Sequence, residues 1–117
     1  MPGKFQPLYR ILLTKAKSDI AIANHAVEAN DQSIDQDSIM FHYQQASEKL
    51  LKALLSWAGV HFEKIHDITR LIECCREANI ALAEGAEELE TLNPYAVQGR
   101  ILPPAPPDFS QKGLFKR

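Results

Sequence analysis

The chain has 117 residues, a formal net charge of −2 at pH 7 and a hydrophobic fraction of 45%. A chain of this length holds one core of ordinary size, so we expect a single domain, and its average composition argues against disorder and fibrous repeats. The slightly negative total excludes broad electrostatic adhesion to a polyanion, so any contact with a nucleic acid has to be local.

Targeting and membrane signals are missing from the sequence. Residues 1–7 lack the apolar core of a signal peptide, and no stretch approaches the roughly 18 uninterrupted apolar residues of a membrane-spanning helix. We therefore expect a cytoplasmic protein without a membrane partner. Cys74 and Cys75 are adjacent, a spacing that strains a disulfide and contains no CxxC metal knuckle, so we expect reduced side chains on a helix.

The first half of the chain contains two segments with apolar residues at three- and four-residue steps. The first begins at Leu8, directly after Pro7, and predicts a helix to about Asn30. The polar stretch 30–38 offers several capping side chains before the second helix, which is expected to end at Gly59. Both helices are long enough to present a wide apolar face.

A third helix is predicted after Asp67, which can cap it, and is expected to stop near Asn79. Its inward residues are predicted to be Ile68, Leu71, Ile72 and Cys75. Residues 80–85 are then expected to form a loop. A further helix is predicted over residues 86–92, with a new start at Asn93-Pro94 and a short helix from Pro94 to Gln98.

The pattern as a whole predicts an all-α fold, because no period-2 strand pattern occurs anywhere. We expect an antiparallel up-down helical bundle of four main helices plus a short C-terminal helix and an extended Pro-rich tail. The bundle is assigned to residues 1–101 and the tail to residues 102–117. Four prolines between 103 and 107 cannot continue a helix, and the tail either becomes ordered against another chain or has no role.

The most distinctive segment is residues 41–59, which carries a polar ridge that we define as His42, Gln45, Lys49 and Lys52. These positions are three or four residues apart and share one side of the predicted helix. Glu48 stands four residues before Lys52, which favours an exposed helical ion pair. The ridge is either a solvated helix face or a binding site for nucleotide or RNA.

Residues 41–53 read Phe-His-Tyr-Gln-Gln-Ala-Ser-Glu-Lys-Leu-Leu-Lys-Ala, followed by Gly59 and by Ile-His-Asp-Ile at 65–68. This order resembles the prokaryotic HEPN domain, over about residues 8–101. The resemblance implies an antiparallel bundle that is usually a homodimer and often assembles with a minimal nucleotidyltransferase. It also implies a family whose members bind nucleotides or cut RNA.

The sequence departs from the ribonuclease members of that family, which carry an arginine separated from a later histidine by four to six residues. No arginine stands at that spacing before His25, His42, His61 or His66. The usual Arg-Tyr-Pro triplet is also replaced by Arg-Ile-Leu-Pro at 100–103. Since RNA cleavage needs a general acid or base and a cation near the phosphate, we do not expect a self-sufficient enzyme.

Three further residues are candidates for chemistry, each with a structural alternative. Arg100 can bind a phosphate or carboxylate, or it can pair with an acidic helix end. Tyr95 can offer a hydroxyl or a stacking ring, or it can lie at the edge of the core. His66 beside Asp67 suggests proton transfer, but Asp67 can instead cap the third helix while His66 bonds back to the second. His61 and His66 are five apart, so no metal is expected, and isolated glycines provide no phosphate loop or cofactor site.

Three functions remain open from the sequence. The first is a homodimeric interaction module that binds a minimal nucleotidyltransferase in a toxin-antitoxin-like system and presents a polar groove to nucleotide or RNA. The second is a metal-independent endoribonuclease, an RNA-cleaving toxin with a non-standard set such as His42, Lys49, His66 and Arg100. The third is a nucleotide-binding domain that acts without a partner chain.

Overall fold

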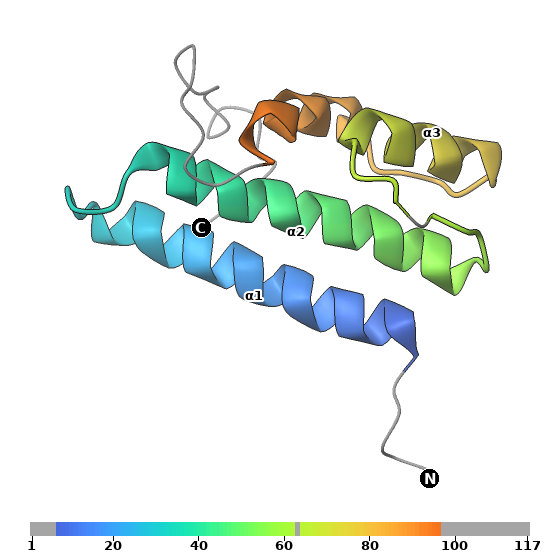
Figure 1. Cartoon of the computed structure of the whole chain (residues 1–117), viewed down its shortest axis with the longest axis horizontal. Helices are drawn as coiled ribbons and strands as arrows, with labels where there is room; N and C mark the ends of the chain where they lie inside the picture. The colour runs from blue at the N-terminus through green and yellow to red at the C-terminus, as the bar shows by residue number, and fades with distance from the viewer. Residues whose placement is uncertain (1–6, 63, 97–117) are drawn as a thin grey trace, which may run out of the picture.

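The computed structural model describes residues 7–62 and 64–96, and this part of the chain is helical (Figure 1). Its elements are α1 (Leu8–Ala29), α2 (Gln36–Trp57), α3 (Ile68–Glu77) and the 3₁₀ helix η1 (Ala86–Tyr95). The described residues contain no strand, which confirms the predicted all-α class. None of these helices combines the length and the apolar character needed to cross a lipid bilayer.

The ends of α1 and α2 follow the expected signals. α1 starts after Pro7 and stops where Asn30 adopts a left-handed conformation with φ of 49°. The Asp35 carboxylate caps α2 by accepting a hydrogen bond of 2.7 Å from the backbone N–H of Ser38. Gly59 ends the second helical segment with φ of 75°, a conformation that glycine adopts without a steric penalty.

The third helix is capped as predicted. Oδ1 of Asp67 accepts a hydrogen bond of 2.8 Å from the backbone N–H of Thr69, which satisfies one of the free donors at the start of α3. The residues predicted to point inward are buried: Ile68, Leu71, Ile72 and Cys75. The helix ends at Glu77, two residues before the expected stop.

The segment after residue 85 differs from the prediction of two short helices. A single 3₁₀ helix runs through it, and Pro94 lies inside η1 instead of starting a new helix. Asn93 does not act as a cap, because its side chain accepts from the backbone N–H of Ile68 at 2.9 Å and donates to Asp67 at 3.0 Å. A tertiary contact with the start of α3 therefore takes the place of the predicted local cap, while residues 97 and 98 lie outside the described part.

The helices do not follow the predicted up-down order throughout. α1 and α2 lie side by side and run in opposite directions, but α3 runs in the same general direction as α2 because residues 58–67 return along the molecule (Figure 1). α3 and η1 both pack on α2 and on each other, whereas α1 packs on α2 alone among these elements. The fold is thus a central α2 between α1 and a layer formed by α3 and η1. The assigned tail, 102–117, lies outside the described residues.

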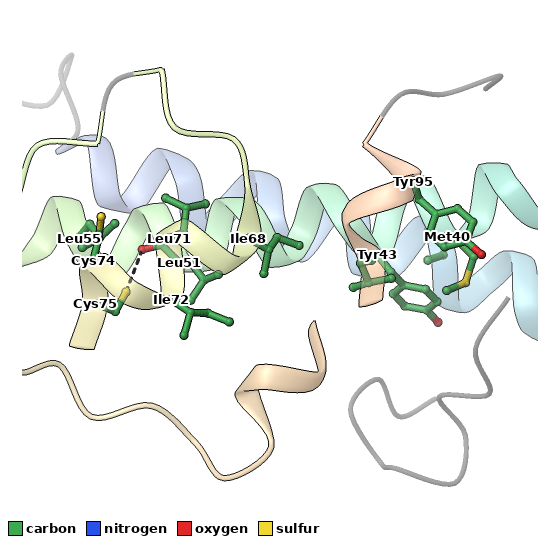
Figure 2. Close-up of a cluster of buried hydrophobic side chains, with 12 residues drawn as sticks. Met40, Tyr43, Leu51, Leu55, Ile68, Leu71, Ile72, Cys74, Cys75 and Tyr95 are labelled. Atoms are coloured by element: carbon green, nitrogen blue, oxygen red, sulfur yellow. Dashed lines mark hydrogen bonds between the residues drawn. The ribbon is translucent and has the colours of Figure 1, made fainter. Parts of the chain in front are cut away.

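The core is a row of buried side chains along α2 (Figure 2). At one end Leu51 and Leu55 meet α3, where the thiol of Cys75 lies 3.9 Å from the backbone oxygen of Leu51. At the other end Met40 and Tyr43 lie near Tyr95 of η1. Cys74 and Cys75 are both free, and burial raises the pKa of the Cys75 thiol. One face of α2 is therefore committed to the core, which leaves its polar ridge on another side.

Candidate functional site

Asp19 of α1 joins two members of the polar ridge. One of its carboxylate oxygens lies 2.9 Å from Nδ1 of His42, and the other lies 2.6 Å from Nζ of Lys49. The Asp19 side chain is only 11% exposed, so its ion pair with Lys49 is partly shielded from water and is stronger than on an open surface. The Phe41 and His42 rings also form a T-shaped contact, with centroids 5.3 Å apart. We call Asp19, His42 and Lys49 the Asp19 cluster.

Glu48 is the centre of a second group. Its Oε2 lies 2.7 Å from Nζ of Lys52 and 2.9 Å from Nδ1 of His66, while Oε1 accepts from the Gln44 amide at 3.0 Å. The prediction of an exposed ion pair is wrong, since the Glu48 and Lys52 side chains are 11% and 13% exposed. Burial raises the pKa of the Glu48 carboxyl, but hydrogen bonds from His66, Lys52 and Gln44 outweigh it and hold this pKa below its usual value.

Gln45 and His66 complete this second group. The Gln45 amide donates to the side-chain oxygen of Gln44 at 2.7 Å, which links Gln45 to Glu48 through the fully buried Gln44. Lys52 approaches Nδ1 of His66 to 3.2 Å and lies 6.0 Å from the centre of the Phe62 ring. We call Gln44, Gln45, Glu48, Lys52 and His66 the Glu48 cluster. The two clusters together contain every member of the polar ridge.

The hydrogen-bonding roles of the two histidines depend on their partners. A carboxylate only accepts, so Nδ1 of His42 donates to Asp19. Nδ1 of His66 lies close to both the Glu48 carboxylate and the Lys52 ammonium, and it donates to Glu48 when it carries the proton. In a neutral imidazole the other nitrogen, Nε2, is then an acceptor. Each lysine ammonium has three donors, of which the carboxylate contact uses one. The clusters therefore hold groups that can both donate to an anion and accept a proton.

An apolar groove adjoins the Asp19 cluster. It is a cavity of about 550 Å³ between the C-terminal half of α1 and the start of α2. Its lining includes Ile22, His25, Ala26, Ile34, Ile39 and His42. Since His42 also contacts Asp19, the groove and the polar ridge share a side chain and form one continuous surface.

The family comparison agrees with the pattern of α2. The HEPN domain profile matches residues 9–112, which is most of the chain. The chain belongs to the HEPN domain family. Searches of curated proteins and of solved structures returned no match. Membership confirms the resemblance drawn from residues 41–68 and relates this HEPN domain to functions that involve nucleotides or RNA.

The structure of this HEPN domain places five of the seven predicted site residues in the two clusters. His42 and Lys49 meet at Asp19, Lys52 and His66 meet at Glu48, and Gln45 joins this second cluster through Gln44. Tyr95 is separate: it is buried in η1 beside Met40, as in the core-edge alternative, and burial raises the pKa of its phenol (Figure 2). Arg100 lies outside the described residues. Within the described part, no group of three His, Cys, Asp or Glu residues is placed to hold a metal.

Sequence reasoning missed Asp19 as a site residue of the HEPN domain. A signal was present, because Asp19 stands three residues after Ala16 and four before Ala23, on the buried side of α1. An acidic residue on an apolar stripe needs a partner, since an unpaired buried charge is costly. The identity of that partner could not be read from the sequence, because His42 and Lys49 are 23 and 30 residues away.

Proposed function

We propose that this HEPN domain binds nucleotide or RNA phosphates through the polar ridge and acts as a module within a larger assembly. The observation that carries the proposal is the use of two buried carboxylates, Asp19 and Glu48, to hold the ridge donors in place. Donors that are already positioned lose little conformational freedom on binding, which increases the affinity gained from each contact. The ridge is therefore better suited to an anion than a row of unattached lysines.

The charge balance of the ridge limits how it binds. Lys49 and Lys52 are each matched by one carboxylate, so the ridge has no large positive field. Binding then depends on directed hydrogen bonds to one or two phosphates. For single-stranded RNA and about two neutralised phosphates, the slope of log affinity against log salt is expected to be roughly −1.4. This shallow slope is consistent with a net charge of −2 for the chain.

The test compares matched lysine variants by calorimetry with ATP and by gel shift with short RNAs. Lys49→Gln combined with Lys52→Gln should weaken both ligands at least tenfold. Lys17→Gln is the control, because Lys17 is exposed and stands two residues from Asp19, so it points to another side of α1. If the double variant keeps its helix content and binds ATP and RNA as tightly as the unmodified protein does, the proposal is contradicted.

The assembly part of the proposal is a homodimer with a minimal nucleotidyltransferase partner in a cytoplasmic toxin-antitoxin-like system. Its support is the family resemblance together with the one-sided packing of α1, which leaves large apolar side chains exposed. These include Leu8 and Ile11 on α1, and Trp57 at the end of α2 is exposed as well. Light scattering should give twice the mass of one chain, and co-expression with a minimal nucleotidyltransferase should recover both proteins together. A monomer that captures no such enzyme would refute this part.

A second candidate function is metal-independent RNA cleavage, and His66 is the observation that favours it. Its side chain is 70% exposed, and its Nδ1 is oriented by the buried Glu48 carboxylate, an arrangement that prepares Nε2 to accept a proton. Lys52 beside it supplies a cation for the phosphate. Cleavage of mixed RNAs that disappears in His66→Ala and Arg100→Ala but persists in His61→Ala would establish this function. If the unmodified protein leaves RNA intact, RNA cleavage is refuted and the phosphate-binding module remains as the proposed function.

A further inference from the structure

We propose that the apolar groove beside His42 binds the base of a nucleotide whose phosphate binds the polar ridge, so that one nucleoside phosphate spans both surfaces. This inference rests on the phosphate-binding role proposed for the ridge and adds the class of ligand that the site selects. Nothing in the family match assigns a ligand to the groove between α1 and α2.

The size and lining of the groove fit a heterocyclic base. A volume of about 550 Å³ lies within the range of small-molecule pockets, which is roughly 300 to 1,000 Å³. Ile22, Ala26 and Ile39 offer apolar surface to the faces of a planar ring, and the lining as a whole is almost entirely apolar. Aliphatic side chains of this kind can contact the faces of a base.

Two imidazole rings also line the groove. His25 comes from α1 and His42 from α2, and histidine is one of the side chains on which bases stack. The His42 ring is held by Asp19 on one side and by its T-shaped contact with Phe41 on another. A ring that is fixed before the ligand arrives loses little entropy on stacking, so His42 is a suitable platform.

The apolar groove lies next to the cationic polar ridge, so a ligand that fills both has an apolar end and an anionic end. His42 lines the groove, its partner Asp19 also holds Lys49, and the two contacts are made to the two oxygens of a single carboxylate. His42 and Lys49 both lie on α2 and are separated by about 10 Å along the helix at a rise of 1.5 Å per residue, a span comparable to the length of one nucleotide. One nucleotide can therefore place its base against His42 and its phosphate at Lys49. An uncharged nucleoside or an inorganic phosphate would use only one of the two surfaces.

The experiment measures ATP, adenosine and inorganic pyrophosphate binding to the full chain by calorimetry. Ile22→Asp and Ile34→Asp place a charge in the groove at positions that are 47% and 38% exposed, where the fold does not depend on an apolar side chain. Both variants should weaken ATP and adenosine about tenfold and leave pyrophosphate unchanged, since stacking of one base contributes about that factor. Leu54→Asp, at a similarly exposed position outside the groove lining, is the matched control and should bind all three ligands normally.

The outcomes separate this inference from the proposed function. If ATP binding depends on Lys49 and Lys52 but not on Ile22 or Ile34, the base site is wrong and the ridge proposal stands. If the lysine variants change nothing, the proposed function fails first. Absence of ATP binding to the unmodified protein overturns the base site. A change from dimer to monomer in Ile22→Asp, measured by light scattering, would also overturn it, because the groove would then be an interface between copies.

Discussion

Nδ1 of His66 and Oε2 of Glu48 lie 2.9 Å apart, which joins the connection ahead of α3 to the middle of α2. The same carboxylate contacts Lys52, which is proposed to bind phosphate, and the buried Gln44 amide. Glu48 therefore connects a proposed ligand-binding residue to the buried interior. Any change at Glu48 is therefore expected to affect stability and ligand binding together.

Glu48→Gln should lower the free energy of unfolding at pH 7 by about 1 to 3 kcal/mol, because Lys52 loses a buried partner. The folded-state pKa of Glu48 is depressed, so its contribution is present above the usual value of 4.5 and is lost as pH falls through the folded pKa. The difference between the two proteins should accordingly shrink below pH 4.5. Urea unfolding at pH 7, 5, 4 and 3 measures this, and a constant difference would contradict the assigned cause.

Leu55→Ala should destabilise the fold by about 2 to 5 kcal/mol, because Leu55 is fully buried where α2 meets α3 and its removal leaves a cavity. Leu54→Ala is the matched control on the same helix. Leu54 is exposed, so its loss should change stability by no more than about 0.5 kcal/mol. Thermal unfolding of both variants tests the placement of the core, and equal losses would refute it.

Asp67→Ala should cost about 1 kcal/mol, because α3 loses its N-terminal cap to Thr69 and the contact with Asn93 of η1. Asp67→Asn should be close to the original protein, since asparagine caps a helix almost as well. Circular dichroism during urea titration gives both values. A loss of similar size in the asparagine variant would mean that charge, and not capping, is the important property of this side chain.

Gly59→Ala should cost about 1 to 2 kcal/mol for conformational reasons alone. The φ of 75° is unfavourable for a residue with a Cβ, while the space around an added Cβ is open to 4 Å. Gly59→Asn should cost less, because asparagine tolerates the left-handed conformation better than alanine. If the two variants unfold at the same urea concentration, the left-handed turn is not what glycine provides at this position.

Local sequence signals were sufficient for most of the helices. Pro7, Asn30, Asp35, Gly59 and Asp67 lie at or next to helix ends because capping and left-handed turns depend on residues close together in the chain. The prediction failed at residues 86–95, where Asn93 bonds to Ile68 and Asp67 instead of to its own helix. A local rule cannot anticipate that choice, because the partner stands 25 residues away in the sequence.

The sequence by itself determined the helical class, the family and the composition of the polar ridge, since each depends on the order and spacing of residues along the chain. The tertiary structure decided what the ridge residues contact. It paired His42 and Lys49 with Asp19 of α1, and it buried the Glu48–Lys52 pair that the sequence had suggested was exposed. Helix periodicity gives the side of a helix on which a residue lies. Which side is covered by another element depends on contacts between distant segments, and those form only when the chain folds.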